Sequence, residues 1–188
     1  MKTYTIIGGV NGSGKSSLTG VLKSTITNMG KIVDPDKIAQ SMDGDTYLAG
    51  QKAIEIIEKC LDENICFTQE STLSGGYTRK VAQRAQDQGY YIRLYYVGLN
   101  SAQECLDRIE NRVKKGGHNI PHTDVIKRFN NRYKVLVKIL PYCNEVKFFD
   151  NENGFIEIAE YKNGELFIKT KEPSPWLLEL RDYLESEQ

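Results

Sequence analysis

The chain has 188 residues, of which 39% are hydrophobic and 27% are charged, and its formal net charge is zero. Such values are ordinary for one soluble globular domain and give the chain as a whole no preference for polyanions. No apolar run approaches the roughly 18 residues of a transmembrane helix, and the first apolar run is too short for a signal peptide, so we expect a cytoplasmic protein.

Strand and helix signals alternate through the first 150 residues. The expected strands lie within residues 4–8, 31–36, 65–70, 90–99 and 145–150. The expected helices cover residues 15–29, 51–63, 76–88, 102–115 and 124–140. Strands separated by helices predict an α/β fold with a five-stranded parallel sheet and helices on both faces.

The pattern changes after residue 150. Two strands within residues 155–161 and 165–170 flank Asn163-Gly164, a pair that favours the positive φ angles of a hairpin turn. A closing helix is expected over residues 173–186, anchored by Trp176. We therefore expect one domain over residues 1–188, with its core in about 1–150. None of the cysteines forms a C-x-x-C pair, so we expect free thiols at Cys60, Cys66, Cys105 and Cys143.

The stretch "GGVNGSGKSS" at residues 8–17 carries the strongest functional signal. Its Gly9, Gly14, Lys15 and Ser16 fit G-x-x-x-x-G-K-[ST] between an expected strand and an expected helix. The alternative, a glycine-rich turn with an incidental lysine, does not explain this context. In such a loop backbone N–H groups surround phosphate, the lysine bridges the β- and γ-phosphates, and the hydroxyl holds Mg²⁺. The predicted ATP- and Mg²⁺-binding residues are Gly9, Asn11, Gly12, Ser13, Gly14, Lys15, Ser16 and Ser17, with Ser16 as metal ligand.

Two aspartates end the second expected strand in "VDPDKIA". Because carboxyl ends of parallel strands line the ligand crevice, Asp36 is a candidate base for a substrate hydroxyl and Asp34 a weaker, substrate-binding candidate. In the alternative interpretation, Asp36 caps the following helix and Asp34 starts the turn.

The third expected strand ends at Glu70, followed by Ser71 and Thr72. Glu70 could hold Mg²⁺ through water or bind a substrate hydroxyl, or it could be an ordinary strand-end residue. Ser71 and Thr72 could bind substrate or cap the next helix. We assign all three to the substrate pocket.

Residues 107–138 carry nine Lys and Arg against three acidic residues, and "KKGGHNIPH" interrupts them as a lid would. Guanidinium groups that close over a transferring phosphoryl group can contribute about 10³–10⁵ in rate. We assign Arg112 and Arg128 to catalysis and His118 to substrate binding in the lid. A solvated basic face is expected for Lys114, Lys115, Lys134 and Lys138.

With these pieces the chain resembles the zeta-toxin family of small P-loop kinases. The resemblance rests on "GGVNGSGKSS", "VDPDKIA", "FTQESTLSG" and "RVKKGGHNIPHTDVIKRF", in the family's order over about residues 4–150. It implies a shikimate-kinase-like core and ATP-dependent phosphorylation of a hydroxyl, in toxin members that of UDP-N-acetylglucosamine. By position it implies that Asp36 is the base, that Lys15 and Ser16 hold ATP and Mg²⁺, and that Glu70 lies in the substrate pocket. Arg112 and Arg128 would serve the lid, and an antitoxin protein becomes a candidate partner.

A small-molecule kinase is therefore the leading hypothesis. The alternative is a nucleotide-dependent switch or interaction module, which would not need a base aimed at a second substrate. Nucleic-acid binding rests only on the basic segment, and residues 150–188 offset it with ten acidic against four basic residues. We expect a small hydroxyl substrate and neither a membrane nor a nucleic acid as partner, with a polynucleotide kinase acting on free ends as the alternative that stays open.

Overall fold

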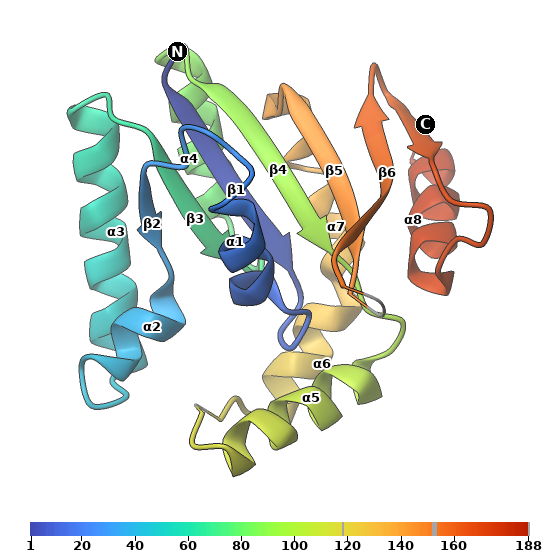
Figure 1. Ribbon diagram of the computed structural model, residues 1–188, viewed down its shortest axis with the longest axis horizontal. Helices are drawn as coiled ribbons and strands as arrows, with labels where there is room; N and C mark the ends of the chain where they lie inside the picture. The colour runs from blue at the N-terminus through green and yellow to red at the C-terminus, as the bar shows by residue number, and fades with distance from the viewer. Residues whose placement is uncertain (118, 152–153, 188) are drawn as a thin grey trace.

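A computed structural model describes residues 1–117, 119–151 and 154–187 (Figure 1). Its strands are β1 (Thr3–Gly9), β2 (Lys31–Val33), β3 (Phe67–Ser71), β4 (Tyr91–Val97), β5 (Glu145–Asp150), β6 (Ile156–Lys162) and β7 (Glu165–Ile168). Its helices are α1 (Lys15–Leu22), α2 (Pro35–Gln40), α3 (Thr46–Asp62), α4 (Tyr77–Asp87), α5 (Ala102–Lys114), α6 (His122–Asn130), α7 (Arg132–Leu136), a 3₁₀ turn η1 (Leu140–Tyr142) and α8 (Pro175–Ser186).

The strands form one sheet in the order β2-β3-β1-β4-β5-β6-β7. The first five are parallel, as the alternating pattern predicts, and β6 and β7 extend the sheet as an antiparallel hairpin. The hairpin turns at Asn163 and Gly164, whose φ angles are 54° and 86°. The predicted α/β fold is therefore confirmed, and the hairpin is part of the main sheet.

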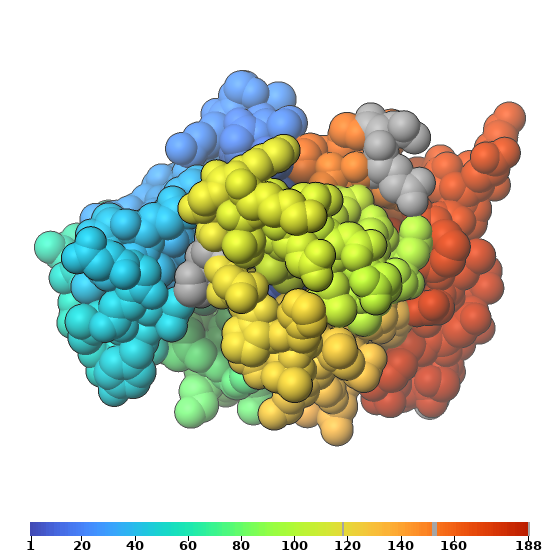
Figure 2. All heavy atoms as spheres, turned by 90° about the horizontal axis from the view of Figure 1, so that it is seen from below, coloured from blue at the N-terminus to red at the C-terminus, as the bar shows by residue number. Residues whose placement is uncertain are grey.

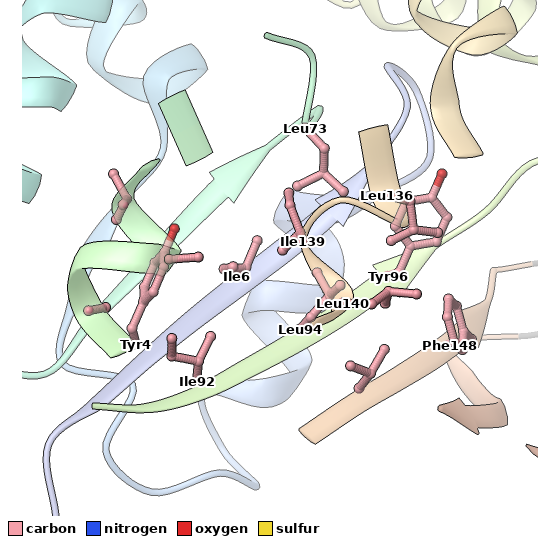
Figure 3. Packing of buried hydrophobic residues seen from close by; sticks show 14 of the residues in the cluster. Tyr4, Ile6, Leu73, Ile92, Leu94, Tyr96, Leu136, Ile139, Leu140 and Phe148 are labelled. Carbon is pink, nitrogen blue, oxygen red and sulfur yellow. The ribbon is translucent and has the colours of Figure 1, made fainter. Parts of the chain in front are cut away.

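Helices cover both faces of the sheet because strand residues alternate between the faces. Tyr4 and Ile6 of β1, with Leu94 and Tyr96 of β4, pack against α3, α4, α7 and α8 on one face (Figure 3). Ile7 packs on the opposite face with α1. All seven residues of β1 are buried, as expected for the central strand of a doubly covered sheet.

The carboxyl ends of the parallel strands point to the lower edge in Figure 1, where the loop between β1 and α1 lies. Figure 2 looks onto this edge: α5 and α6, yellow-green to gold, lie across it beside the blue-to-cyan segment that carries α2. We call α5, α6 and the described residues between them the lid.

Two of the expected helices are shorter in the structure. The helix expected over 15–29 ends at Leu22, where the Ser24 and Thr25 hydroxyls donate to the carbonyls of Val21 and Leu22. Such local bonds compete with helix continuation. The helix expected over 124–140 is divided into α6, α7 and η1, and the Asn131 side chain donates to the Lys127 carbonyl at the first break.

Helix α3 begins five residues before the expected start because Asp45 caps it. The Asp45 carboxylate accepts from the N–H groups of Tyr47 and Leu48 at 3.0 and 2.9 Å. Helix α5 begins with a side-chain cap, since the Ser101 hydroxyl accepts from the Glu104 N–H at 3.0 Å.

The C-terminal helix α8 packs against the end of β4 and against α7. The Trp176 ring lies against Gly98, where any Cβ would overlap it. The Trp176 carbonyl accepts from the Tyr133 hydroxyl of α7 at 2.5 Å. The expected anchoring role of Trp176 is therefore confirmed.

All four cysteines carry free thiols, as expected. Within the described ranges, no helix combines the length and the apolarity that crossing a bilayer would require.

Candidate active site

The glycine loop turns sharply between β1 and α1 because its glycines adopt backbone angles that other residues avoid. Gly12 and Gly14 have φ angles of 79° and 97°. A Cβ on Gly12 would lie 3.0 Å from the carbonyl oxygen of Cys105 in α5, and one on Gly14 would overlap Asn151. The loop is thus enclosed between the lid and the end of β5.

The loop leads directly into α1, which begins at Lys15. The Lys15 ammonium is folded back and donates to the Val10 carbonyl at 3.1 Å. Asn11 and Ser13 are buried in the loop, Gly9 lies at the end of β1, and Ser17 is exposed on α1. The predicted nucleotide-binding residues therefore form one continuous turn at the N-terminus of a helix, where backbone N–H groups and the helix dipole favour an anion.

Ser16 stands between two carboxylates from different strands. Its Oγ lies 2.6 Å from Glu70 Oε2, at the end of β3, and 3.1 Å from Asp34 Oδ2, after β2. A second hydroxyl, that of Thr19, donates to Glu70 Oε1 at 2.7 Å. Both carboxylates are buried, with 5% of Asp34 and 4% of Glu70 exposed.

These charges are poorly balanced in the absence of a cation. Burial raises the pKa of Glu70, the neighbouring Asp34 raises it further, and the hydrogen bonds from Ser16 and Thr19 act against this. Burial lowers the pKa of Lys15, and the negative charges of Asp36, Glu70 and Asp34 counteract that effect. Two buried carboxylates beside a hydroxyl suit Mg²⁺, which usually takes one or two carboxylates together with substrate phosphates. Among the residues that the structure describes, no group of three His, Cys, Asp or Glu forms a fuller metal site.

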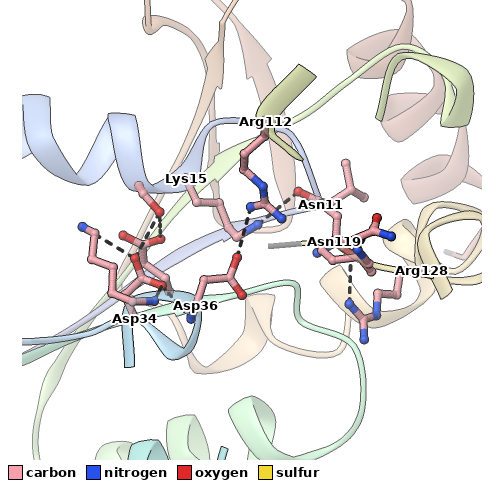
Figure 4. Close-up of polar contacts among 12 residues, drawn as sticks. Asn11, Lys15, Asp34, Asp36, Arg112, Asn119 and Arg128 are labelled. Atoms are coloured by element: carbon pink, nitrogen blue, oxygen red, sulfur yellow. Dashed lines mark hydrogen bonds and ion pairs between the residues drawn. The ribbon is translucent and has the colours of Figure 1, made fainter. Parts of the chain in front are cut away.

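Asp36 is not the cap of the helix that follows β2. Asp34 is the N-cap of α2, and its Oδ1 accepts from the N–H groups of Asp36 and Lys37 at 3.0 and 3.3 Å. The capping alternative for Asp36 is therefore wrong. Its carboxylate is half-exposed and faces the lid (Figure 4).

The two predicted lid arginines both contact this end of the sheet. Arg112 Nη1 of α5 lies 3.2 Å from Asp36 Oδ2. Arg128 Nη1 of α6 donates to Asn11 Oδ1 in the glycine loop at 3.0 Å (Figure 4). These two contacts thus join, at one site, pairs of residues that are 76 and 117 positions apart in the sequence.

The remaining predicted residues lie farther from the carboxylates. The Ser71 hydroxyl bonds to Thr78 of α4 at 2.8 Å and accepts from the Leu73 N–H, while Thr72 bonds to Ser74 in an exposed turn. Neither is the N-cap of α4, which is Gly76. His118 lies outside the described residues.

Two residues of the site are absent from the sequence-based assignment. Thr19 lies one helical turn after Ser16, so the shared face of α1 is a signal that could have identified it. Asn151, directly after β5, donates from its side chain to the Ser13 carbonyl at 2.9 Å. Only its position at a strand's carboxyl end could have indicated this role.

Comparison with known proteins gives one relative in sequence and several in structure. No protein-family model matches the sequence. An uncharacterized protein of Haemophilus influenzae is 36% identical over 124 residues, which are 63% of this chain and 86% of the relative.

Among solved structures, a chain of the AvrRxo1-ORF1:AvrRxo1-ORF2 complex with sulphate ions has a TM-score of 0.69 at 18% identity over 96% of this chain. The same complex with ATP has a TM-score of 0.66 at 17% identity. A chain of the PezAT chromosomal toxin-antitoxin system of Streptococcus pneumoniae has a TM-score of 0.63 at 16% identity, and the match covers 99% of this chain and 85% of that one. This chain spans only 63% of the first AvrRxo1 chain's length. At such identities the likeness establishes the fold alone.

Proposed function

Because this chain belongs to the same family as the Haemophilus influenzae protein and has the zeta-toxin-like P-loop kinase fold, we propose that it is an ATP-dependent kinase. It would transfer the γ-phosphoryl group of ATP to a hydroxyl group of a small molecule. The glycine loop alone would serve a switch protein equally well, so the proposal depends on a base placed for a second substrate.

The placement of Asp36 is the observation that supports a kinase most directly. It follows β2, whereas Asp34 takes both the capping role and the contact with Ser16. Asp36 is thus left half-exposed, beside the lid arginine Arg112 and within the electrostatic reach of Lys15. A carboxylate between a phosphate-binding lysine and an open surface suits proton acceptance from an entering hydroxyl.

In the proposed step, the acceptor oxygen attacks the γ-phosphorus and its proton passes to Asp36. The bond from the γ-phosphorus to the β–γ bridging oxygen breaks, and ADP leaves. Lys15 neutralises the β- and γ-phosphates. Ser16, Asp34 and Glu70 would hold Mg²⁺, which when bound offsets charge on the phosphate oxygens. We propose this metal-holding role for both carboxylates, which for Glu70 is the first of its two predicted alternatives and for Asp34 differs from the predicted substrate role.

The lid arginines fit the same step. Phosphoryl transfer spreads negative charge over the equatorial oxygens, and arginines directed at that charge accelerate it. Arg112 is already beside Asp36, and Arg128 is beside the loop that would hold the phosphates. Each arginine therefore contacts a residue that the proposed step uses.

The test is phosphoryl transfer by Asp36→Asn, with pooled hydroxyl acceptors and UDP-N-acetylglucosamine tried first. We expect ATP affinity near that of the wild type and transfer lower by about 10²–10⁴-fold, the usual worth of a general base. Asp45→Asn is the matched control, because Asp45 is also an aspartate at a helix start but lies exposed at α3. Full transfer by Asp36→Asn would refute the mechanism, and an ATP-binding protein that modifies no acceptor would favour the switch.

Because the PezAT chain belongs to a toxin-antitoxin system, we also propose an antitoxin protein as a partner of this chain. Growth arrest on induction of the wild type, absent with Asp36→Asn, would support a toxic kinase that needs such a partner. Unimpaired growth with active enzyme present would contradict it.

A further inference from the structure

The junction between α6 and α7 contains an arginine that the proposed reaction does not use. Arg132, the first residue of α7, has only 10% of its side chain exposed. Its guanidinium group lies 3.8 Å from the ring centre of Phe129 and 4.2 Å from that of Tyr133. Its Nη1 donates to the Phe129 carbonyl at 2.9 Å, and its Nη2 donates to the Glu179 carboxylate of α8. Because a buried charge is costly unless it is paired and hydrogen-bonded, these contacts hold the side chain in one place.

The contacts of Arg132 connect α8 to the end of α6 that carries the lid arginine Arg128. Phe129, whose carbonyl accepts from Arg132, directly follows Arg128 and belongs to an apolar cluster shared by α5, α6 and Val10 of the glycine loop. Arg128 Nη1 in turn donates to the side chain of Asn11 in that loop at 3.0 Å. Arg132 therefore lies between the body of the molecule and the lid residue that reaches the glycine loop.

The same turn of α8 also contacts the other end of the lid. The Trp176 N–H donates to Asn100 Oδ1 at 3.2 Å, and Asn100 lies directly before the N-cap of α5. The Trp176 carbonyl accepts from the Tyr133 hydroxyl of α7. Glu179 is three residues farther along α8, so it lies on the same face of that helix as Trp176. Both ends of the lid are thus fixed to one turn of one helix.

We propose that Arg132 is a positioning residue, which holds the end of α6 on α8 so that Arg128 is directed at the phosphates bound in the glycine loop. This inference rests on the proposed kinase function and assigns to Arg132 an effect that acts through Arg128. An arginine suits the role because its planar group can stack on aromatic rings while its N–H groups bond in two directions, whereas a lysine keeps only the charge. A misplacement of about 1 Å can cost about 10²-fold in rate, so the position of Arg128 matters for turnover.

The competing explanation is an ion pair that only stabilises the fold, and a double-mutant cycle in kcat at saturating ATP separates the two. Arg132→Lys should lower the kcat of the wild type by about 10–100-fold, with little change in the KM for ATP. In an Arg128→Ala background the same substitution should cost less than about twofold, because the side chain that it positions is absent. Losses that multiply in the double variant would overturn the proposal.

Arg84→Lys is the matched control, because Arg84 also joins two helices through carboxylates, those of Glu58 and Asp62, but it joins α4 to α3. It should leave kcat near that of the wild type, and an equal fall in kcat for Arg84→Lys and Arg132→Lys would overturn the proposal. If Arg132→Lys does not fold, Glu179→Ala removes the same anchor at a half-exposed position and should show the same dependence on Arg128.

Amide hydrogen exchange tests the anchoring of the lid without any turnover. In protein saturated with Mg²⁺ and a non-hydrolysable ATP analogue, Arg132→Lys should speed exchange in α6 by about tenfold or more, while α4 exchanges as in the wild type. Faster exchange in α6 of a protein that phosphorylates no acceptor would support the anchoring and count against the kinase proposal alone. Unchanged exchange in α6 would overturn the inference, whatever the activity of the protein.

Discussion

Replacing Glu70 by glutamine should make the ligand-free protein more stable and remove its response to Mg²⁺. The amide has the shape of the carboxylate, so it can keep a hydrogen bond from Ser16 or Thr19 while removing a buried negative charge. The raised pKa of Glu70, caused first by burial and then by Asp34, indicates that its surroundings disfavour that charge. A carboxylate held in such a place without a cation costs stability.

The expected gain in unfolding free energy follows from the geometry at Ser16. Glu70 Oε2 and Asp34 Oδ2 lie 2.6 and 3.1 Å from Ser16 Oγ, so they are separated by no more than the sum of these distances, 5.7 Å. Two like charges at that separation repel by about 3 kcal/mol at an effective dielectric constant of about 20. Weaker hydrogen bonds from Ser16 and Thr19 to an amide offset about 2 kcal/mol of this. The net gain is about 1 kcal/mol, or about 2–4 °C in Tm for a chain of this length.

Thermal unfolding as a function of pH, with and without Mg²⁺ and ATP, measures both effects. Because the folded pKa of Glu70 lies above its usual value of 4.5, the unfolded chain loses the proton first. Wild-type stability from this group is therefore present below about pH 4.5 and is lost as pH rises through the folded pKa. The advantage of Glu70→Gln should be largest at neutral pH and vanish near pH 4. A lower Tm in the variant at neutral pH, with an unchanged Mg²⁺ response, would refute the reasoning.

Four further substitutions test other parts of the site and fold. Lys15→Ala should strongly weaken ATP binding and abolish turnover, and wild-type ATP affinity by calorimetry would contradict the P-loop assignment. Arg112→Ala and Arg128→Ala should lower kcat more than they raise the KM for ATP, because their charges act mainly in the transition state, whereas a change in Tm alone would make them structural. Gly98→Ala should destabilise the fold by about 1–3 kcal/mol in denaturant unfolding because its Cβ overlaps Trp176, and an unchanged midpoint would show that α8 can move away.

Much of the site could be predicted from the sequence because its signals are local. The glycine loop needs particular backbone angles at Gly12 and Gly14, and these leave a recognisable pattern. The capping role of Asp34 could also be predicted from the sequence. Proline favours the first position of a helix, so Pro35 makes the preceding Asp34, and not Asp36, the N-cap.

Other features depend on contacts that no local pattern records. Arg112 and Asp36 are 76 residues apart, and their approach depends on how the lid packs over the sheet. The division of α6 from α7 depends on one side-chain bond from Asn131 competing with a helix that the apolar spacing favours. The strand-end position of Glu70 is compatible with either Mg²⁺ or substrate, and no local pattern shows that the Ser16 hydroxyl lies 2.6 Å from its carboxylate.

The central place of β1 in the sheet has a consequence for the synthesis of the chain. Its residue Thr3 pairs with Tyr91 of β4, and Tyr4 pairs with Phe67 of β3, so both neighbours are made long after β1 itself. At about 5–20 residues per second, the 88 residues from Thr3 to Tyr91 take about 4–18 s to be added. For the first part of that interval, until Phe67 is added, the buried strand β1 has neither of its partners, and afterwards it has only β3. The nascent chain should therefore depend on chaperones until β4 has left the ribosome, and growth temperature should affect its yield more than that of a protein whose first strand lies at a sheet edge.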